Sequence, residues 1–342
     1  MKKIYLIREK PSKFGGAEVY LSRLAKALEE EGIEHQVVHS IFPKFLPSWL
    51  RIILFNFQVC LTKREKLYFS LERIVCPDVY RAGDGVHKVF LSVEKKSKFN
   101  PLHPVYLFLE KRCFYNARRI IANSQMIKNE IIQTYGVDAN KIDVVYNGVE
   151  SKEIDFDRSY KKLSKEFELI PDVPIILYVG SGFKRKGVAE FLQIISGLGH
   201  DFQAFIVGKE KNMLYYQQLA EQIGVFDKVI FTGPRIDVED FYTISDVFLF
   251  PTHYEPFSNV VLEAMSFGNA VFTTKQNGAC EVLHSNFIMT SPKDMSIVKE
   301  LDGLLTNKEY LKDEKKRSLG KVMRFSIQEN MTNTLNSIRK SL

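Results

Sequence analysis

Short apolar runs alternate with amphipathic segments along most of the chain, a pattern that is typical of α/β proteins with parallel sheets. The first apolar run is at residues 4–7, and the segment that follows, 17–31, repeats its apolar side chains at helical spacing. Gly32 ends this predicted helix, as glycine often does after a last helical turn. A second strand, predicted at 36–39, completes a strand–helix–strand unit, so the chain is predicted to begin as a doubly wound domain.

The rest of the first half continues this alternation. Further strands are predicted at residues 78–82, 119–122 and 142–146. Asn123 and Ser124 are good N-caps for a helix that ends near residue 135. Residues 41–75 are apolar, aromatic and basic, and they predict one or two helices, one of them at 49–62.

A second alternating array predicts another doubly wound domain. Its strands are expected at residues 175–179, 203–207, 229–231, 246–250 and 270–274. Residues 150–168 are charged and aperiodic and are interpreted as a linker. Asp155 and Asp157 within it have a spacing that can hold a divalent cation, but no apolar strand precedes them. Both aspartates are therefore interpreted as ordinary linker charges, and no metal site is predicted.

Composition agrees with two soluble domains. The chain has 342 residues, of which 45% are hydrophobic and 26% are charged. No apolar run reaches the roughly 18 residues that a transmembrane helix needs. Four cysteines are scattered without metal-ligand spacing and are expected to be reduced thiols in the cytoplasm: Cys60, Cys76, Cys113 and Cys280.

Positive charge is concentrated in the first half. Residues 1–165 hold 29 Lys and Arg against 19 Asp and Glu, whereas residues 166–342 hold 19 against 22. Residues 86–119 combine eight basic side chains with aromatic ones, which is typical of a segment that lies on an anionic membrane surface. A solvated basic helix with core aromatics is the alternative. Nucleic acid ranks lower as a partner, because no recognised binding motif accompanies the segment.

The stretch after the predicted strand 246–250 carries the strongest chemical signal. Ser258 is placed to cap a helix whose first amides, from Asn259 to Val261, lack intrahelical partners and therefore favour an anion. Glu255 and Glu263 border this helix start. A phosphate flanked by two carboxylates suits a nucleotide sugar, which has hydroxyls at both ends. Two solvated glutamates on a surface helix are the alternative.

Other candidates lie at the ends of predicted strands. Arg185 and Lys186 follow the strand 175–179, where cations can grip a diphosphate. Gly15 and Gly16 open the first helix and allow a ligand to approach the backbone closely. Asp84 stands between two glycines at a strand end. A solvated basic loop and simple turns are the alternatives.

The segment Glu-Pro-Phe-Ser-Asn at 255–259, followed by Leu-Glu-Ala-Met-Ser-Phe-Gly at 262–268, resembles the signature of retaining glycosyltransferases with the GT-B fold, in particular family 4. The resemblance extends to Phe14-Gly-Gly, to Val-Tyr-Asn-Gly-Val at 145–149 and to Arg185-Lys-Gly-Val, and it is greatest for lipopolysaccharide core glucosyltransferases. It implies two doubly wound α/β domains facing each other across a cleft. The domains are expected at 1–165 for the acceptor and 166–320 for the donor, with a helix at 321–342 crossing back to the first domain.

The resemblance also implies roles for individual residues. The catalytic set is Lys186, Arg185, Glu255 and Asp84. The donor-binding set is Gly15, Gly16, Arg235, Ile236, Phe257, Ser258, Asn259, Val260 and Glu263. The resemblance implies that Glu255 contacts the donor sugar and that Glu263 binds the ribose hydroxyls. The backbone at 235–236 is expected to contact the base. Asp84 and His87 are expected on the acceptor side.

The implied activity is metal-independent transfer of a hexose with retention, from a UDP-linked donor to a membrane-associated glycan such as the lipopolysaccharide core. The nucleotide sugar is a substrate, and no further cofactor is expected. The expected partners are a glycolipid or oligosaccharide acceptor and an anionic membrane surface, with the protein peripheral on the inner face of the cytoplasmic membrane. A sugar-nucleotide epimerase on the same fold and a non-catalytic membrane or nucleic-acid binding protein are the alternatives.

Overall fold

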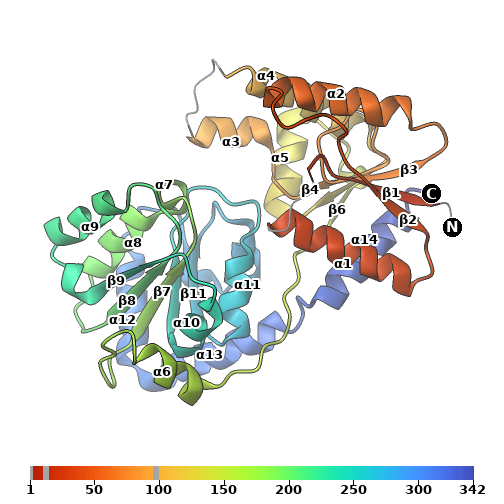
Figure 1. Ribbon diagram of the computed structural model, residues 1–342. Coiled ribbons are helices and arrows are strands. Elements are labelled where there is room, and N and C mark those ends of the chain that lie inside the picture. Colours follow the sequence, from red (N-terminus) through yellow and green to blue (C-terminus); the bar gives the residue numbers. More distant parts are fainter. Residues whose placement is uncertain (1–2, 11–14, 95–99) are drawn as a thin grey trace. The chain divides into compact units, whose positions relative to one another are not determined.

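The computed structural model describes residues 3–10, 15–94 and 100–342. The predicted contributions of Phe14, Lys95, Lys96, Lys98 and Phe99 lie outside these ranges. The chain forms two compact α/β units, Met1–Asn147 with Ile327–Leu342 and Gly148–Ser326 (Figure 1). Each unit holds one parallel six-stranded sheet, which confirms the predicted doubly wound architecture.

The first unit is built on a sheet with the strand order β2-β1-β3-β4-β5-β6. Its strands are β1 (Ile4–Ile7), β2 (His35–Val38), β3 (Leu67–Ser70), β4 (Val79–Ala82), β5 (Arg119–Ala122) and β6 (Ile142–Val144). Its helices are α1 (Gly16–Glu30), α2 (Ser48–Leu61), α3 (His87–Glu94), α4 (Leu102–Asn116), α5 (Gln125–Tyr135) and α14 (Ile327–Arg339), with the 3₁₀ turn η1 (Ala139–Lys141). Leu24 of α1 and Leu335 of α14 share one core cluster, and Phe55 of α2 belongs to another.

The second unit is built on a sheet with the order β12-β11-β10-β7-β8-β9. Its strands are β7 (Ile175–Val179), β8 (Gln203–Val207), β9 (Val229–Gly233), β10 (Val247–Phe250), β11 (Ala270–Thr274) and β12 (Ile288–Met289). Its helices are α6 (Phe156–Leu163), α7 (Phe183–Lys186), α8 (Val188–Ser196), α9 (Met213–Gln222), α10 (Val238–Ile244), α11 (Asn259–Ser266), α12 (Ile297–Thr306) and α13 (Lys308–Val322), with the 3₁₀ turns η2 (Phe226–Lys228), η3 (Gly278–Val282) and η4 (Ser285–Phe287). Strands β7, β8, β10 and β11 are almost wholly buried, as expected for a parallel sheet covered on both faces.

The predicted linker at 150–168 is wrong in part, because it contains α6. Asp155 caps this helix by accepting the amide of Arg158 at 3.0 Å. Ser159 and Lys162 then bind Asp240 of α10 at 2.7 and 2.5 Å. The segment therefore belongs to the second unit, and the first unit gives way to the second after Asn147 rather than at residue 165.

The boundary between the second unit and the C-terminal helix lies later in the sequence than predicted. Helix α13 stays with the second unit as far as Val322, and only α14 belongs to the first unit. Thr334 of α14 hydrogen-bonds the Tyr20 hydroxyl of α1 at 2.9 Å, and Asn330 donates to the carbonyl of Tyr146. Helix α14 is thus part of the core of the first unit (Figure 1).

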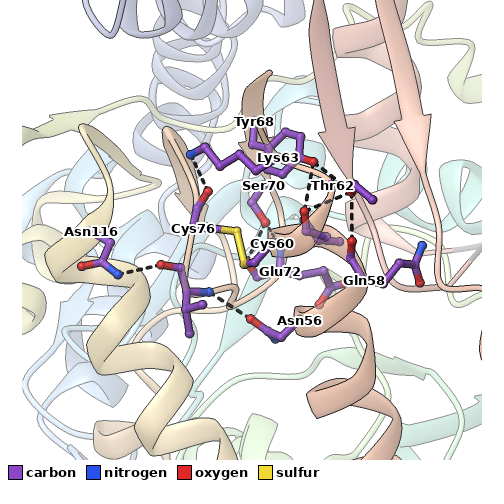
Figure 2. The surroundings of a disulfide bond; sticks show 12 residues. Asn56, Gln58, Cys60, Thr62, Lys63, Tyr68, Ser70, Glu72, Cys76 and Asn116 are labelled. Atoms are coloured by element: carbon purple, nitrogen blue, oxygen red, sulfur yellow. Dashed lines mark hydrogen bonds between the residues drawn. A yellow bond between two sulfur atoms is a disulfide. The ribbon is translucent and has the colours of Figure 1, made fainter. Parts of the chain in front are cut away.

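The prediction of four reduced thiols is wrong for two of them. Cys60, at the end of α2, forms a disulfide with Cys76 in the loop after β3 (Figure 2). Cys113 and Cys280 are free. Strand β3 lies in a stretch where only helices were predicted, and it brings the Cys76 loop beside α2. Over the described ranges, no helix combines the length and apolar content needed to cross a bilayer.

Candidate active site

The second sheet reverses its direction of winding between β7 and β10, which are neighbours although β8 and β9 come between them in the chain. Ligands of doubly wound sheets bind outside the carboxyl ends of the strands at such a switch point. The loop after β7 carries Arg185 and Lys186, and the loop after β10 carries Glu255. Three residues predicted from separate motifs therefore meet at the position where the fold favours a ligand.

The three side chains form a charged cluster. Arg185 pairs with Glu255 and also donates to the carbonyl of Tyr254 at 2.7 Å. The Lys186 Nζ lies 3.7 Å from the Glu255 Oε1. The side chains of Arg185, Lys186 and Glu255 are 29%, 19% and 14% exposed. The cluster is thus held in place by ionic contacts while it remains accessible to a ligand.

A glycine at position 187 makes this close approach of the loops possible. Helix α7 is a single turn between Gly182 and Gly187, both of which have left-handed backbone conformations. A Cβ at Gly187 would lie 1.9 Å from the carbonyl oxygen of Pro251, so only glycine fits there. The amide of His253 then donates to the carbonyl of Arg185 at 2.9 Å. The loops after β7 and β10 are therefore joined directly through their backbones.

Helix α11 begins next to Glu255 but differs from the prediction in two details. Ser258 occupies the N-cap position, yet its side chain makes no capping hydrogen bond. Within the described ranges its buried hydroxyl has no hydrogen-bond partner. The amide of Val261 donates to the Ser258 carbonyl at 3.2 Å, so the prediction that this amide awaits an anion is wrong. Asn277 fixes the helix start by accepting the Ser258 amide at 3.2 Å.

The residues on either side of Ser258 have different surroundings. Phe257 is 6% exposed and contributes to the core. Asn259 is exposed and Val260 is half-buried at the first turn of α11. At the helix start Asn259 is therefore the exposed residue, while Ser258 and the Phe257 ring are buried.

Tyr242 positions Glu263 and was missed by the sequence analysis. Its hydroxyl donates to the Glu263 Oε2 at 3.2 Å, and its ring stacks on Phe267 with centroids 5.6 Å apart. Burial and the neighbouring Glu263 charge raise the pKa of Tyr242, so its hydroxyl stays protonated and remains a donor. The two partners are 21 residues apart in different helices, and no local pattern connects them.

Arg235 and Ile236 lie beyond β9, two strands away from β7 in the sheet. The Arg235 guanidinium binds Glu166 at 2.5 and 2.8 Å and Asp237 at 2.9 Å, and the hydrogen bond from Arg235 lowers the pKa of Asp237. The Ile236 side chain is fully exposed. The guanidinium already has carboxylate partners, and a role for the backbone of this loop in holding the base stays a prediction.

The first sheet has its own switch point between β1 and β3. Gly15 and Gly16 follow β1 and begin α1, with Gly15 at φ 133°. A Cβ at Gly15 would lie 2.6 Å from a Glu18 carboxylate oxygen. Arg8 binds that carboxylate at 2.6 Å and binds Glu72, after β3, at 2.8 Å. The predicted glycine pair therefore lies at the switch point beside a charged network.

Asp84 and His87 follow β4 and are linked through Arg73, which the sequence analysis did not identify. The Asp84 side chain is 74% exposed and lies 3.9 Å from the Arg73 guanidinium. Arg73 also binds the fully buried Glu110 at 3.0 Å, and Glu110 accepts the amide of His87 at 2.6 Å. This contact fixes the start of α3.

The His87 ring is enclosed by aromatic and basic groups. Its Nε2 lies 3.2 Å from the Nδ1 of His103, and its ring packs against Phe90 and Tyr106. Burial, together with the charges of Arg73 and His103, lowers the pKa of His87 to about 4. His87 is therefore neutral at neutral pH and can act as a hydrogen-bonding group there rather than as a cation.

The basic segment 86–119 holds both buried and exposed aromatic side chains. Phe114 is fully buried and belongs to the core. Phe108 is 58% exposed, on the same helix as the exposed Lys111 and Arg112. The described part of the segment thus combines core aromatics with an exposed aromatic and basic surface.

Two family models match parts of the chain. Residues 159–321 match the model described as glycosyl transferases group 1. Residues 84–153 match the model described as Glycosyltransferase Family 4. The two matched ranges contain Asp84, His87 and every predicted site residue of the second unit.

Curated relatives agree with these matches. The capsular polysaccharide biosynthesis glycosyltransferase CapM of Staphylococcus aureus is 29% identical over 227 residues, which cover 61% of this chain and 57% of that protein. The lipopolysaccharide glucosyltransferase WaaG of Escherichia coli is 36% identical over 104 residues, which cover 29% of this chain and 28% of that protein. The chain therefore spans little more than half the length of CapM, and less of WaaG.

Solved structures share the fold over the whole chain. The crystal structure of WaaG, a glycosyltransferase involved in lipopolysaccharide biosynthesis, matches with a TM-score of 0.80 at 19% identity over 98% of this chain and 99% of that chain. HepE of Anabaena, in complex with UDP and glucose, matches with a TM-score of 0.75 at 18% identity over 99% and 100% of the two chains. These likenesses confirm the predicted GT-B type of fold.

Proposed function

Because the chain belongs to the glycosyltransferases of the group 1 and family 4 type, we propose that it moves a hexose from a nucleoside diphosphate to a hydroxyl group with retention at the anomeric carbon. UDP is the proposed nucleotide, and a membrane-associated glycan such as the lipopolysaccharide core is the proposed acceptor. The observation that carries the proposal is the meeting of Arg185, Lys186 and Glu255 at the switch point of the second sheet. Relatives of the chain act on lipopolysaccharide or have been solved with UDP and glucose, which supports both choices.

The leaving diphosphate gains negative charge in the transition state, and cations placed beside it stabilise that charge. In the free protein Arg185 is partly neutralised by Glu255. A diphosphate would compete for Arg185, while Lys186 would approach it from the next position of the chain. Glu255 would then be released to accept hydrogen bonds from hydroxyls of the sugar. The same two cations would do the work that a metal ion does elsewhere, so no metal is required.

The start of α11 offers further groups to the diphosphate. The Ser258 hydroxyl is buried and lacks a partner within the described ranges, so it is available as a donor. The helix start adds backbone amides and the positive end of the helix dipole. Glu263, held by Tyr242 at 3.2 Å, would bind the ribose hydroxyls from the same helix.

Retention does not require Glu255 to act as a nucleophile. Glycosidases that retain configuration use a carboxylate for covalent attack on the sugar. In the proposed donor complex the carboxylate of Glu255, released from Arg185, instead accepts hydrogen bonds from the sugar hydroxyls, which gives it a binding role rather than a covalent one. The leaving phosphate is then the proposed acceptor of the proton that the incoming hydroxyl loses.

The first unit is proposed to bind the acceptor. Gly15 and Gly16 allow close approach at its switch point, and Asp84 and His87 offer an exposed carboxylate and a neutral imidazole after β4. The basic segment 86–119 would hold the protein on the inner face of the cytoplasmic membrane, where a lipid-linked acceptor is found. No nucleic-acid partner is proposed.

A screen of nucleotide sugars by thermal unfolding tests the donor assignment. A ligand at about 100 times its Kd stabilises the folded state by about 2.7 kcal/mol. We expect UDP-hexoses to raise the melting temperature of the wild-type protein, and transfer to persist in excess chelator. Stabilisation by none of the nucleotide sugars, or transfer that chelator abolishes and manganese restores, would contradict the proposal.

A further inference from the structure

A cavity of about 760 Å³ opens in the first unit between α2 and α4. This volume is within the range of about 300–1,000 Å³ that is usual for small-molecule sites. Its walls are almost entirely apolar and include Ile53, Phe57, Val75, Val105, Phe108 and Leu109. No residue of the candidate active site is among the described side chains that line it, so the cavity needs a separate explanation.

The cavity results from two helical stripes that face each other without filling the space between them. On α2 the lining residues recur at 53, 56, 57 and 60, which is one helix face. On α4 they recur at 105, 108, 109, 112 and 116. Phe57 and Phe108, one on each helix, remain 62% and 58% exposed. Exposed apolar side chains around an apolar hollow are typical of a surface that is covered when it functions.

The polar groups of the walls indicate what kind of molecule fits. Asn56 accepts the amide of Val75 at 2.9 Å (Figure 2). It also donates to the carbonyl of Ile52 at 3.2 Å. Asn116 donates to the carbonyl of Val75 at 2.6 Å. A peptide in the cavity would bring backbone amides and carbonyls that need hydrogen-bond partners. A hydrocarbon chain needs no hydrogen-bond partners. Because the amide side chains in the walls already bind the protein backbone, the cavity favours a hydrocarbon chain over a peptide.

Positive charge at the edge of the cavity indicates the headgroup. Arg112 lines the cavity, and its guanidinium lies 5.7 Å from the centroid of the Phe108 ring. Lys111 is exposed on the same helix. From this complementarity we infer that the cavity takes one hydrocarbon chain of an anionic membrane lipid, with Arg112 beside the phosphate of its headgroup. The inference rests on the membrane binding of the proposed function. It assigns the cavity as the binding site for a lipid of that membrane.

Titration calorimetry with dodecyl phosphate below its micelle concentration tests this inference. We expect saturable binding of one molecule per chain, and no binding of inorganic phosphate alone. Val105→Asp should weaken binding at least tenfold, because it places a charge in the apolar wall. Val105→Trp should weaken it similarly by filling the space without adding charge. Leu61→Asp is the matched control, since Leu61 is 77% exposed on α2 and does not line the cavity.

The headgroup assignment is tested with Arg112→Gln. This variant should weaken binding of dodecyl phosphate and leave binding of the neutral dodecyl maltoside unchanged. Equal binding by the wild type, Val105→Asp and Val105→Trp would overturn the inference, as would a dimer in sedimentation experiments that Val105→Asp dissociates. A far-ultraviolet circular dichroism spectrum like that of the wild type shows that each variant is folded. Stabilisation of each variant by a UDP-hexose separates failure of the lipid site from failure of the proposed donor, which binds the other unit.

Discussion

Lys186 is held less tightly in the candidate active site than Arg185, because Arg185 already binds Glu255 and the carbonyl of Tyr254. We therefore expect Lys186→Ala to lower kcat by ~100-fold or more, the usual effect of losing one preorganised group that stabilises charge. Lys184→Ala is the matched control, because Lys184 is an exposed lysine in the same helical turn. Steady-state kinetics with a UDP-hexose measure kcat of both variants. Full activity of Lys186→Ala would remove this lysine from the mechanism.

Tyr242 acts on the donor only through Glu263. Tyr242→Phe keeps the ring that stacks on Phe267 and removes one hydrogen bond, so it should raise the donor KM about three- to tenfold with kcat nearly unchanged. Tyr310→Phe is the control, since it removes a similar hydrogen bond to Glu300 outside the site. A fall in kcat of the same size as the rise in KM would argue against a ribose-binding role for Glu263.

His87 should make the protein less stable in acid. Its pKa is about 4 in the folded state, against an ordinary value of 6.5, so between these values the unfolded chain binds a proton that the folded chain does not. The stability contribution is therefore fully present above pH 6.5 and is lost as the pH falls towards 4. Melting temperatures should fall more steeply from pH 7 to pH 5 in the wild type than in His87→Gln. Parallel curves would show that His87 is not buried as a neutral group.

At the scale of whole elements, the disulfide connects the end of α2 to the loop after β3. Cross-linking residues 16 positions apart should stabilise the first unit by ~3 kcal/mol. We expect the double variant Cys60→Ser, Cys76→Ser to unfold at a lower urea concentration, observed through Trp49, the only tryptophan of the chain. Cys280→Ser should leave that transition unchanged, because Cys280 is a free thiol of the second unit.

The same bond also affects the cavity, because Cys60 is one of its lining residues. Disulfides are rare in the reducing cytoplasm, where the proposed function places the protein. Alkylation of thiols in intact cells, followed by mass spectrometry, measures which form is present there. Coincident urea transitions of the wild type and the double variant would mean that the bond does not form in solution.

Periodicity predicted the long apolar elements better than the short or highly charged ones. The helix expected at 49–62 is observed at Ser48–Leu61, because a long stripe of apolar residues is a strong signal. Strand β3 was missed, since a short, mainly apolar run of four residues after a charged run cannot be distinguished from a piece of buried helix. Helix α6 was missed because most of its residues are polar and exposed, so the segment resembled a charged linker.

The candidate active site could be predicted where its residues form a local motif. Glu255 and Glu263 were found because both lie in one loop-and-helix segment. Tyr242 and Arg73 were not, since each reaches its partner through the order of strands and the packing of helices. A single sequence carries no direct record of those neighbours.

At the scale of the whole molecule, the uneven charge predicts binding to anionic membranes. Each Lys or Arg near such a surface contributes about 1 kcal/mol, and salt weakens the attraction. We expect the protein to sediment with vesicles of phosphatidylglycerol but not with vesicles of phosphatidylcholine. Lys88→Glu combined with Lys111→Glu should release it, because both lysines are exposed in the basic segment.

The matched control reverses two exposed lysines of α13 in the second unit, Lys312→Glu and Lys316→Glu, and should leave sedimentation unchanged. Equal loss of binding in both double variants would show that net charge alone attracts the protein. Retained binding in both would leave the basic segment without a role at the membrane.

Helix α14 has a consequence for how the chain folds during synthesis. Met331, Leu335 and Ile338 complete the core that begins with β1 and α1, yet the ribosome makes them after the whole of Gly148–Ser326. Domains fold as units during translation, usually in the order in which they emerge. Here the unit that starts first must wait with an open apolar face until the inserted unit has been made. The nascent first unit is therefore the part of this chain that most needs a chaperone.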